Sequence, residues 1–519
     1  MIENKIAVSI TASNLIEVVS NIVSANKLAD LIEIRLDYLQ DKDLHQDSEE
    51  ILKATTKVRQ KPLIFTYRSG KKEVVPNRSI QGISRLLGSR TQELSIDYFD
   101  FDLSANNTTT FHLYSTYQRL FGKSAKIILS HHNFENCEME ELFSIYNRLA
   151  TLTPEVIKVV AKANKLSDQL AIFSLLETAK KENLSLIALA MGESGQISRI
   201  LAPSHGSFLT FASMEKGLES APGQFTLEQM QSLYRVKSIN QETKIFCLLG
   251  NPVGHSMSPY IHNAALRDLE ENGVYLPIAV PDNELSEFVE KFLHPKTRQM
   301  KWSFTGASVT VPHKVTIQAL LDEIDPIAKE IGAVNTIVVK EDRLIGYNTD
   351  VLGAITPLKT MLNLQKANVA ILGVGGASRA LIAGLKAEGA NITIYGRDKE
   401  KLSYLIKHFG VNGKPFAESD KLSCDLLVNT TPIGMTGWKS DTQIPIKPEA
   451  LKNCGMVYDL VYNPMMTPLL EEAQRQGIPI LGGLDMLIAQ AVEQLKLWTG
   501  LEPPLEIMRN AALKKLGMG

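Results

Sequence analysis

Short runs of apolar residues, separated by longer and more polar stretches, repeat along the first half of the chain. Eight runs lie at Ile6–Ile10, Leu31–Leu36, Pro62–Tyr67, Ile96–Asp102, Lys126–Leu129, Val156–Ala161, Leu184–Leu189 and Phe208–Phe211. Runs of this length are typical of buried strands, and most of the stretches between them are long enough for a helix. Eight such repeats within about 220 residues predict an α/β fold with a closed (β/α)8 TIM barrel rather than an open sheet.

The repeat stops after the eighth run. Residues Thr226 through Tyr234 predict a closing helix, because Thr226 and Gln229 have the spacing of a capping box. Only the short polar stretch Lys237–Thr243 precedes the next predicted strand, Lys244–Leu249. We therefore expect a domain boundary here, with a connection too short to act as a loose tether.

The clearest motif of the second half is a glycine-rich turn between a strand and a helix. The predicted strand Asn368–Leu372 runs into residues 373–380, GVGGASRA, and then into an alanine- and leucine-rich helix, Leu381–Ala387. Glycines in this place allow a tight turn and let the backbone approach a pyrophosphate at the helix N-terminus. The motif predicts a Rossmann-type dinucleotide-binding domain, with Ala377 or Ala380 in the packing role of the third glycine.

The next strand indicates which dinucleotide is bound. Asn391–Tyr395 is followed by Gly396, Arg397 and Asp398, with Lys401 one helical turn further on. An arginine at this place favours the 2′-phosphate of NADP, and Lys401 adds charge that a phosphate would use. Asp398 leaves NAD as the alternative. We predict NADP.

Length and charge narrow the class of protein. A chain of 519 residues exceeds what one hydrophobic core usually supports, so two or three domains are expected. Lysine and arginine number 55 against 57 aspartates and glutamates, which gives no broad attraction to nucleic acid or an anionic membrane. The N-terminal residues lack a signal-peptide pattern, and no apolar run reaches the ~18 residues of a membrane span. We expect a soluble, cytoplasmic protein with small-molecule substrates.

The four cysteines predict neither a disulfide framework nor a zinc site. Cys137, Cys247, Cys424 and Cys454 lie far apart in the sequence, without a CxxC pair or a histidine at metal-ligand spacing. This pattern is typical of reduced thiols in a cytosolic protein. We expect no metal.

Several polar residues interrupt or end the predicted barrel strands, where the chemistry of such barrels gathers. Lys158 lies within the apolar run VIKVV; it is either a desolvated amine able to form an imine or a lysine that snorkels to solvent. His132, directly after the fifth run, is a candidate proton shuttle or a structural loop residue. Glu33 and Arg35 share one face of the second strand and form either a salt bridge or a substrate clamp.

Two pairs in the second half carry weaker signals. Ser256 and Ser258 offer hydroxyls for a carboxylate, although Ser-x-Ser before proline is also a common turn with a helix cap. Lys314 and Asp350 are candidates for an ammonium and a carboxylate that share a substrate hydroxyl. Their spacing alone does not bring them together.

Taken as a set, the motifs of residues 1–236 resemble type I 3-dehydroquinate dehydratase. The matching segments are IEIRLD, FTYRSG, SHHNF, VIKVV, GQISR and SAPGQ. The resemblance implies that Lys158 forms an imine with the C3 ketone of the substrate, and that His132 removes a C2 proton and later protonates the departing C1 hydroxyl. The residues implied to hold the substrate are Glu33, Arg35, Arg68, Arg199, Ser220 and Gln224.

The sequence departs from this family pattern in two places. The family has a glutamate that orients the histidine shortly after FTYRS, whereas Glu73 stands one residue late here. Asn133 stands where many relatives have aspartate.

The second half resembles shikimate dehydrogenase from residue 244 to near the C-terminus. The matching segments, in their usual order, are GNPVGHSMSP, TVPHK, GAVNT, GYNTD, GVGGASRA, NTTPIGM, DLVYNP and GGLDMLIAQA. The resemblance implies Lys314 and Asp350 as the catalytic pair. It implies the following substrate ligands: Ser256, Ser258, Asn335, Asp350, Tyr462 and Gln490. It places these residues at the cofactor: Gly373, Gly375, Gly376, Ala377, Arg397, Lys401, Asn429, Thr430, Met435 and Gly483. Asp485 departs from the pattern, because many bacterial relatives have glycine there.

These resemblances predict three domains. A barrel is expected over 1–236, a substrate-binding domain over 244–353 completed by helices of 486–519, and an NADP-binding domain over 354–485. The two implied reactions are consecutive, since the product of the first, 3-dehydroshikimate, is the substrate of the second. The alternatives are another imine-forming aldolase or lyase barrel, a quinate dehydrogenase, or one half that serves as a ligand sensor or scaffold. The last would require loss of catalytic residues, yet Lys158, His132, Lys314 and Asp350 are all present.

Overall fold

The structure is a computed structural model that describes residues 4–39, 48–68, 97–103, 114 and 126–518. It divides into two compact units. The first comprises residues 1–243 with 290–292 and 298–303; the second comprises residues 244–289, 293–297 and 304–519.

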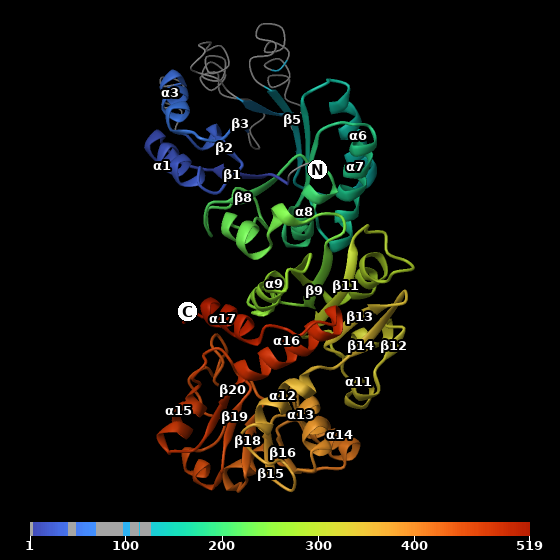
Figure 1. Cartoon of the computed structure of the whole chain (residues 1–519), viewed down its shortest axis with the longest axis vertical. Helices are drawn as coiled ribbons and strands as arrows, with labels where there is room; N and C mark the ends of the chain where they lie inside the picture. The colour runs from blue at the N-terminus through green and yellow to red at the C-terminus, as the bar shows by residue number, and fades with distance from the viewer. Residues whose placement is uncertain (1–3, 40–47, 69–96, 104–113, 115–125, 519) are drawn as a thin grey trace. The chain divides into compact units, whose positions relative to one another are not determined.

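The first unit is built on eight parallel strands in the order β7-β6-β5-β4-β3-β2-β1-β8 (Figure 1). An isolated parallel bridge between Leu186 and Ser207 links the two ends of this ladder, so the predicted barrel is confirmed as a nearly closed one. The strands are β1 (Ile6–Ile10), β2 (Leu31–Arg35), β3 (Leu63–Tyr67), β4 (Tyr98–Asp102), β5 (Lys126–Asn133), β6 (Val156–Lys162), β7 (Leu186–Met191) and β8 (Thr210–Ser213).

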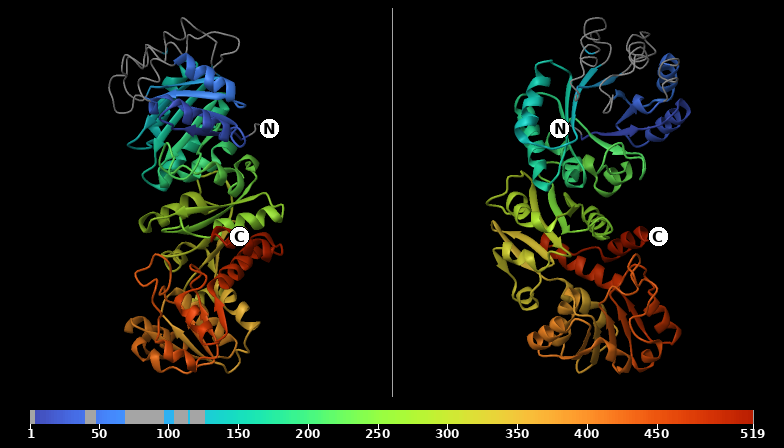
Figure 2. Two further views of the ribbon diagram at one scale, coloured as in Figure 1. Left: turned by 90° about the vertical axis from the view of Figure 1, so that its left-hand side faces the viewer. Right: turned by 180° about the vertical axis from the view of Figure 1, so that it is seen from behind.

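Helices cover the outside of the barrel strands, as Figures 1 and 2 show for α6 and α7. They are α1 (Leu15–Ala25), α3 (Ser48–Val58), α6 (Met139–Ala150), α7 (Gln169–Lys181) and α8 (Gln196–Leu201). The capping box predicted after the barrel is present, because Thr226 N donates to Gln229 Oε1 over 2.9 Å and Gln229 N donates to Thr226 Oγ1 over 3.2 Å. The helix that follows is short and ends in a π-turn, Gln229–Leu233.

The second unit begins with a mixed sheet in the order β10-β9-β11-β13-β14-β12. Its strands are β9 (Lys244–Gly250), β10 (Gly273–Ala279), β11 (Ser303–Val309), β12 (Glu323–Ile324), β13 (Thr336–Lys340) and β14 (Arg343–Tyr347). Its helices are α9 (Ser258–Asp268), α10 (Leu285–Phe288) and α11 (Pro326–Ile331). The later helices α16 (Gly483–Thr499) and α17 (Leu505–Lys515) share a hydrophobic core with this sheet, through residues that include Leu495, Trp498 and Met508.

A second, parallel sheet follows in the order β17-β16-β15-β18-β19-β20. This is the doubly wound order, which changes direction between β15 and β18. The strands are β15 (Asn368–Leu372), β16 (Asn391–Gly396), β17 (Asn412–Pro415), β18 (Leu426–Asn429), β19 (Val457–Asp459) and β20 (Ile480–Gly482). The helices are α12 (Asp350–Lys359), α13 (Gly376–Ala387), α14 (Lys399–Phe409) and α15 (Pro468–Arg475).

Strand alternation explains why this sheet is covered on both faces. Val369 and Ile371 of β15 pack in one core with residues of α13 and α14. The intervening Ala370 and Leu372 pack in another core with residues of α15. Because successive side chains of a strand point to opposite faces, a continuous apolar run lets one strand supply both cores.

Two cysteines that are far apart in the sequence lie side by side in this sheet. Cys424 and Cys454 form an isolated parallel bridge, and their Sγ atoms are 3.7 Å apart. All four cysteines are free. The expectation from spacing alone missed this contact, because parallel pairing joins positions that are separated by a whole crossover.

Within the described part of the chain, no helix is long and apolar enough to cross a membrane. The same residues contain no group of three or more His, Cys, Asp or Glu side chains that could hold a metal ion.

Candidate active sites

The amine of Lys158 lies inside the barrel among buried carboxylates. Lys158 is 1% exposed on β6, and its Nζ donates to Asp100 Oδ2 over 2.7 Å. The Nζ atom is also 3.6 Å from Glu33 Oε1 and 4.3 Å from the centre of the Phe211 ring. The snorkelling alternative is therefore wrong, and the charge of the ammonium is compensated inside the protein.

Glu33 is fixed in place by two hydroxyl groups. Ser9 Oγ donates to its Oε2 over 2.5 Å, and Thr66 Oγ1 donates to its Oε1 over 2.8 Å. Burial by itself would raise the pKa of Glu33, but the charges of Lys158, Arg68 and Arg35 outweigh burial and lower it to about 2. Glu33 is thus a carboxylate throughout the physiological range.

His132 lies on β5 rather than in the loop after it, because the strand continues to Asn133. In the parallel register Ser130 pairs with Lys158, and His132 two residues later points to the same side of the sheet. The ring is 5% exposed, and its Nδ1 is 3.1 Å from Asp102 Oδ2. Burial and the charge of Arg68 lower the pKa of His132 to about 4, against the opposing effect of Asp102. The imidazole is therefore a neutral base near pH 7.

Arg199 is a buried cation without a carboxylate neighbour among the described residues. It is 2% exposed, and burial lowers the pKa of its guanidinium to about 10. One Nη donates to the carbonyl of Pro222 over 3.0 Å, while Nε has no hydrogen-bond partner. A buried guanidinium without a carboxylate partner favours the binding of an anion, because a buried charge that is not compensated costs free energy.

The remaining predicted barrel ligands lie at strand ends and in the loop that Arg199 contacts. Ser220 and Gln224 hydrogen-bond each other across that loop, with Gln224 Nε2 donating to Ser220 Oγ over 3.1 Å. Arg68 Nε is 3.9 Å from Asp102 Oδ2, beside His132. Arg35 forms a two-point ion pair with Asp37 at 2.9 and 2.7 Å, so the suggested Glu33–Arg35 salt bridge is not the arrangement found. Glu73 lies outside the described residues.

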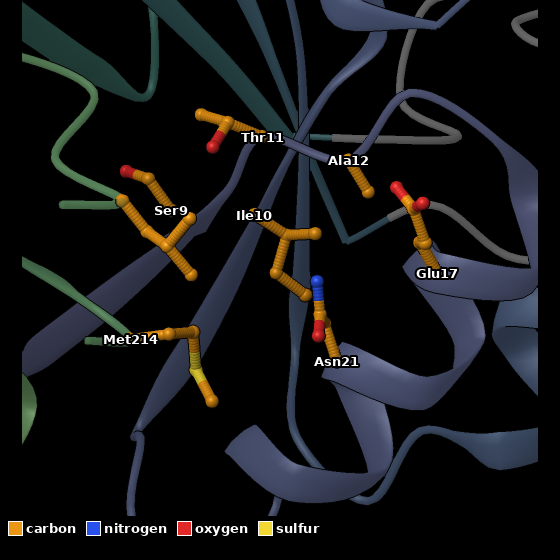
Figure 3. Close-up of a pocket in the computed structure, with 8 residues that line it drawn as sticks. Ser9, Ile10, Thr11, Ala12, Glu17, Asn21 and Met214 are labelled. Carbon is orange, nitrogen blue, oxygen red and sulfur yellow. The ribbon is translucent and has the colours of Figure 1, made fainter. Parts of the chain in front are cut away.

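A pocket of about 240 Å³ opens at the carboxyl end of β1. Figure 3 shows Ser9 to Ala12 along one wall, with Glu17 and Asn21 of α1 and Met214 around them. Ser9 both lines this pocket and donates to Glu33, so the pocket adjoins the lysine site.

In the second unit the structure brings Lys314 and Asp350 together. Lys314 Nζ donates to Asp350 Oδ2 in a short ion pair, with the two side chains 23% and 10% exposed. Asn335 Nδ2 donates to the other carboxylate oxygen over 2.9 Å. Asp350 starts α12 immediately after the turn Asn348–Thr349, and this turn places the carboxylate beside the lysine.

Ser256 and Ser258 form a local turn, which was one of the two alternatives for this pair. Ser256 Oγ accepts from Ser258 N over 3.1 Å in the turn before α9, whose N-cap is Met257 and has no side-chain cap bond. Ser258 is nevertheless only 8% exposed. Tyr462 and Gln490 are both largely covered, and Gln490 Nε2 donates to the carbonyl of Leu487 over 2.8 Å.

The glycine-rich turn leaves room where a phosphate would lie. Gly373 has a φ of 116°, and an added Cβ would stand 2.5 Å from Thr430 Oγ1. At Gly375 and Gly376 an added Cβ would meet nothing within 4 Å. Ala377, which follows in the first turn of α13, is partly covered. The backbone at the helix start is thus open to an anion, as a dinucleotide requires.

Arg397 and Lys401 are exposed beside this turn, while Asp398 is engaged by the helix. Asp398 Oδ1 accepts from the N–H groups of Glu400 and Lys401 over 3.1 and 3.0 Å and so caps α14. These bonds lower the pKa of the carboxyl group. An aspartate that caps a helix in this way is a poor ligand for the diol of a ribose. The fold therefore explains the presence of Asp398, which had left NAD as the alternative cofactor.

Three other residues implied at the cofactor have structural contacts. Asn429 is fully buried; its Nδ2 donates to Asp459 Oδ1 over 2.9 Å, and its Oδ1 accepts from Thr431. Thr430 Oγ1 contacts Ser378 Oγ at 2.7 Å. At Gly483 an added Cβ would lie 2.2 Å from the carbonyl oxygen of Leu460, so only glycine fits the start of α16. Met435 is partly covered.

Family models match along both units. Residues 6–241 match "Type I 3-dehydroquinase" and residues 248–337 match "Shikimate dehydrogenase substrate binding domain". Residues 368–436 match "NADP oxidoreductase coenzyme F420-dependent", and residues 483–513 match "Shikimate 5'-dehydrogenase C-terminal domain". The chain is 34% identical to the chloroplastic bifunctional 3-dehydroquinate dehydratase/shikimate dehydrogenase of Arabidopsis thaliana, over 97% of this chain and 83% of that one.

The chain belongs to the bifunctional 3-dehydroquinate dehydratase/shikimate dehydrogenase family.

The dehydrogenase half also resembles single-function proteins. It is 40% identical to the NADP(+)-dependent shikimate dehydrogenase of Methanocaldococcus jannaschii, over 54% of this chain and 99% of that one. A solved shikimate 5-dehydrogenase of Thermus thermophilus, in complex with NADP(H) and shikimate, is 34% identical over 52% of this chain and 99% of that one, with a TM-score of 0.47.

Sequence reasoning missed two carboxylates in the dehydratase half. Asp100 pairs with Lys158, and Asp102 is next to His132. The segment YFDFD held the signal, because two aspartates two residues apart in a buried strand face one side. The unusual Asp485 of the dehydrogenase half is paired with Arg509 of α17.

Proposed function

We propose that the barrel dehydrates 3-dehydroquinate through an imine on Lys158. The buried Lys158 amine, beside two carboxylates and a neutral histidine, is the observation that carries this proposal. Asp100, at 2.7 Å, accepts the proton that the ammonium must lose before attack. The amine adds to the C3 ketone, and water leaves as the C=N bond forms.

His132 moves the proton in the next steps. It removes a proton from C2, and the electron pair passes to the protonated imine to give an enamine. The C1 hydroxyl then leaves as water with the proton returned by His132, and water hydrolyses the imine to free Lys158 and 3-dehydroshikimate. Arg199 binds the ring carboxylate, which supplies the anion that its buried guanidinium lacks. Ser220 and Gln224, in the loop that Arg199 contacts, hold the carboxylate or a hydroxyl with Glu33, Arg35 and Arg68.

We propose that the second unit reduces 3-dehydroshikimate to shikimate. The cluster of Lys314, Asp350 and Asn335 carries this assignment, because it places an ammonium and a carboxylate where one ring oxygen can contact both. Lys314 stabilises the negative charge that develops on the C3 oxygen and donates the proton. Ser256 and Ser258 bind the carboxylate, while Tyr462 and Gln490 lie at the ring.

The cofactor residues fit NADP. When it is bound, the reduced cofactor supplies the hydride. Gly373, Gly375 and Gly376 make room for the pyrophosphate, and the charges of Arg397 and Lys401 hold the 2′-phosphate. Thr430 and Met435 lie toward the nicotinamide.

The test supplies 3-dehydroquinate to the purified chain with and without NADPH. With NADPH we expect shikimate and an equal amount of NADP; without it, 3-dehydroshikimate accumulates. Quinate with NADP serves as the comparison. Turnover of quinate in preference to shikimate would contradict the proposal, and so would cleavage of a carbon–carbon bond in 3-dehydroquinate.

We place the protein in the cytoplasm. The four free thiols support a reducing compartment. Fractionation of cells that express the tagged full chain tests this placement, and recovery of the chain in an organelle would contradict it.

A further inference from the structure

A chain of buried hydrogen bonds starts at the Lys314–Asp350 pair and leads away from it. Asn335 Nδ2 donates to Asp350 Oδ1 over 2.9 Å, and Thr336 Oγ1 donates to Asn335 Oδ1 over 2.7 Å. Asn335 and Thr336 are 2% and 0% exposed. The carboxylate that faces Lys314 is therefore oriented by an amide that is itself held from behind.

The next link is Gln494, on α16. Its Nε2 donates to Thr336 Oγ1 over 3.1 Å and to the carbonyl oxygen of Asn335 over 3.3 Å. Its Oε1 accepts from Ser308 Oγ over 2.7 Å. Gln494 is 1% exposed, so water does not replace these bonds when they are lost.

Beyond Ser308 the chain ends at Tyr275, which packs against α9, the helix that begins at Ser258. Tyr275 donates its phenol proton to Ser308 Oγ over 2.8 Å. Ser258, one of the two serines assigned to the carboxylate, is 8% exposed and begins α9, the helix that also carries His262. The Tyr275 ring is stacked on the His262 ring with 4.4 Å between centres, which fixes its direction.

From Tyr275 onward every link donates toward Asp350. Tyr275 donates to Ser308, Ser308 to Gln494, Gln494 to Thr336, Thr336 to Asn335 and Asn335 to Asp350. Hydrogen bonds that are aligned in this way polarise one another. At position 494 the chain needs a group that accepts on one atom and donates from another, which an amide provides and an ionised carboxylate does not.

We propose that Gln494 is a positioning residue of the dehydrogenase reaction: it orients Asp350 through Thr336 and Asn335, and it holds Tyr275, which packs against the helix that Ser258 begins, through Ser308. This inference rests on the proposed function of the second unit. Gln494 acts on the Lys314–Asp350 pair through Asn335, and on the side of the proposed carboxylate site through Ser308 and Tyr275. Its loss therefore affects both turnover and the binding of 3-dehydroshikimate, while NADPH binding is unaffected.

The first test replaces Gln494 by methionine, which keeps the length of the side chain but neither accepts nor donates as the amide does. We expect kcat/KM for 3-dehydroshikimate to fall about tenfold or more, because three buried hydrogen bonds are lost, with an unchanged KM for NADPH. Trp498→Phe is the matched control. This substitution removes the hydrogen bond that Trp498 Nε1, on the same helix, donates to the carbonyl of Ile337 over 2.9 Å. That bond is not part of the chain between Tyr275 and Asp350.

The second test uses Gln494→Glu and a readout that a purely structural role would not change. A protonated carboxyl group accepts on one oxygen and donates from the other, so it can replace the amide; an ionised one cannot donate to Thr336. Relative to wild type, kcat of this variant should be close to normal at acidic pH and fall as pH rises through the pKa of the new carboxyl group. If Gln494→Met does not fold, the inference can still be tested with Gln494→Glu.

Two results would overturn the inference in a chain that reduces 3-dehydroshikimate: Gln494→Met indistinguishable from Trp498→Phe, or Gln494→Glu with the pH profile of wild type. A wild-type chain that does not reduce 3-dehydroshikimate would instead contradict the proposed function, so the two failures are distinguishable.

Discussion

The carboxylates of Asp100 and Glu33 balance the positive charge of Lys158. These two residues therefore control how the ammonium group becomes a nucleophilic amine. If Lys158 forms the imine, borohydride added with 3-dehydroquinate should reduce it and leave a ligand-sized mass on a peptide that contains Lys158. Peptide mass spectrometry measures the adduct. Lys162→Ala, which alters an exposed lysine at the end of the same strand, is the control that should still be labelled. An adduct that persists in Lys158→Ala would exclude the assignment.

The lowered pKa of His132 predicts the acid limit of the dehydratase. A base with a pKa of about 4 is neutral at pH 5, whereas an ordinary histidine near 6.5 would already be protonated. The kcat/KM for 3-dehydroquinate should therefore stay level from pH 7 to about 5 and fall near pH 4.

Asp102 supplies the control for this profile. Its charge raises the pKa of His132, so Asp102→Asn should move the acid limit to lower pH. A bend near pH 6.5 in the wild-type profile would contradict the neutral, buried imidazole.

Arg397 is the residue whose charge should distinguish the two nicotinamide cofactors. A charge-assisted bond to phosphate is worth about 1.5–3 kcal/mol, so Arg397→Ala should weaken NADPH binding roughly tenfold or more. NADH binding should change little, because it has no 2′-phosphate. Titration of each cofactor against intrinsic fluorescence measures both affinities, and an equal loss for both would show that Arg397 does not contact the phosphate.

The start of helix α16 leaves no room for a side chain larger than that of glycine. A methyl group at Gly483 would stand 2.2 Å from the carbonyl oxygen of Leu460, and backbone cannot move away as a side-chain end can. Gly483→Ala should lower the stability of the second unit by about 1–3 kcal/mol or more and reduce dehydrogenase activity, with the dehydratase retained.

The control for this prediction is Gly254→Ala, where the new methyl group would meet nothing within 4 Å. The free energy of unfolding of this variant, measured by thermal denaturation, should differ from that of wild type by less than about 0.5 kcal/mol. If the two variants unfold alike, the tight contact at Gly483 does not constrain α16.

The sequence predicted the elements better than the contacts between them. Alternating apolar runs located the barrel strands and β15 to within a few residues, since burial on both faces leaves a plain hydrophobic signal. The sequence did not reveal which side chains contact each other across strands. Asp100 and Lys158 are 58 positions apart, and Lys314 and Asp350 are 36 apart, so only the folded sheets bring each pair together.

Local contacts also decided how single polar groups are used. Asn429, expected at the nicotinamide, directs its side chain into bonds with Asp459 and Thr431, and Asp398 caps a helix. Neither use leaves a periodic signal in the sequence, because each depends on one turn of backbone.

On the scale of the whole molecule, the residues assigned to each proposed site all lie within one unit. The residues assigned to dehydration lie between Glu33 and Gln224, and those assigned to reduction lie between Ser256 and Gln490. Lys158→Ala should abolish dehydration and leave the reduction of supplied 3-dehydroshikimate near normal. Lys314→Ala should do the reverse and let 3-dehydroshikimate accumulate, because loss of a positioned acid or base costs about 10²–10⁴-fold.

Separate assays of 3-dehydroshikimate absorbance and NADPH consumption check this independence for each variant. A comparable loss of reduction in Lys158→Ala would mean that the two activities share one site.

The shared core of β9, β10, α16 and α17 has a consequence for synthesis on the ribosome. Phe246 and Tyr275 leave the ribosome long before Leu495, Trp498 and Met508, which complete their packing. About 200 residues separate the two sets, which corresponds to roughly 10–40 s of translation at ~5–20 residues per second. The barrel strands are all made before this interval begins. During it, the nascent substrate-binding sheet has an incomplete apolar core, and that is when a chaperone would have most to shield.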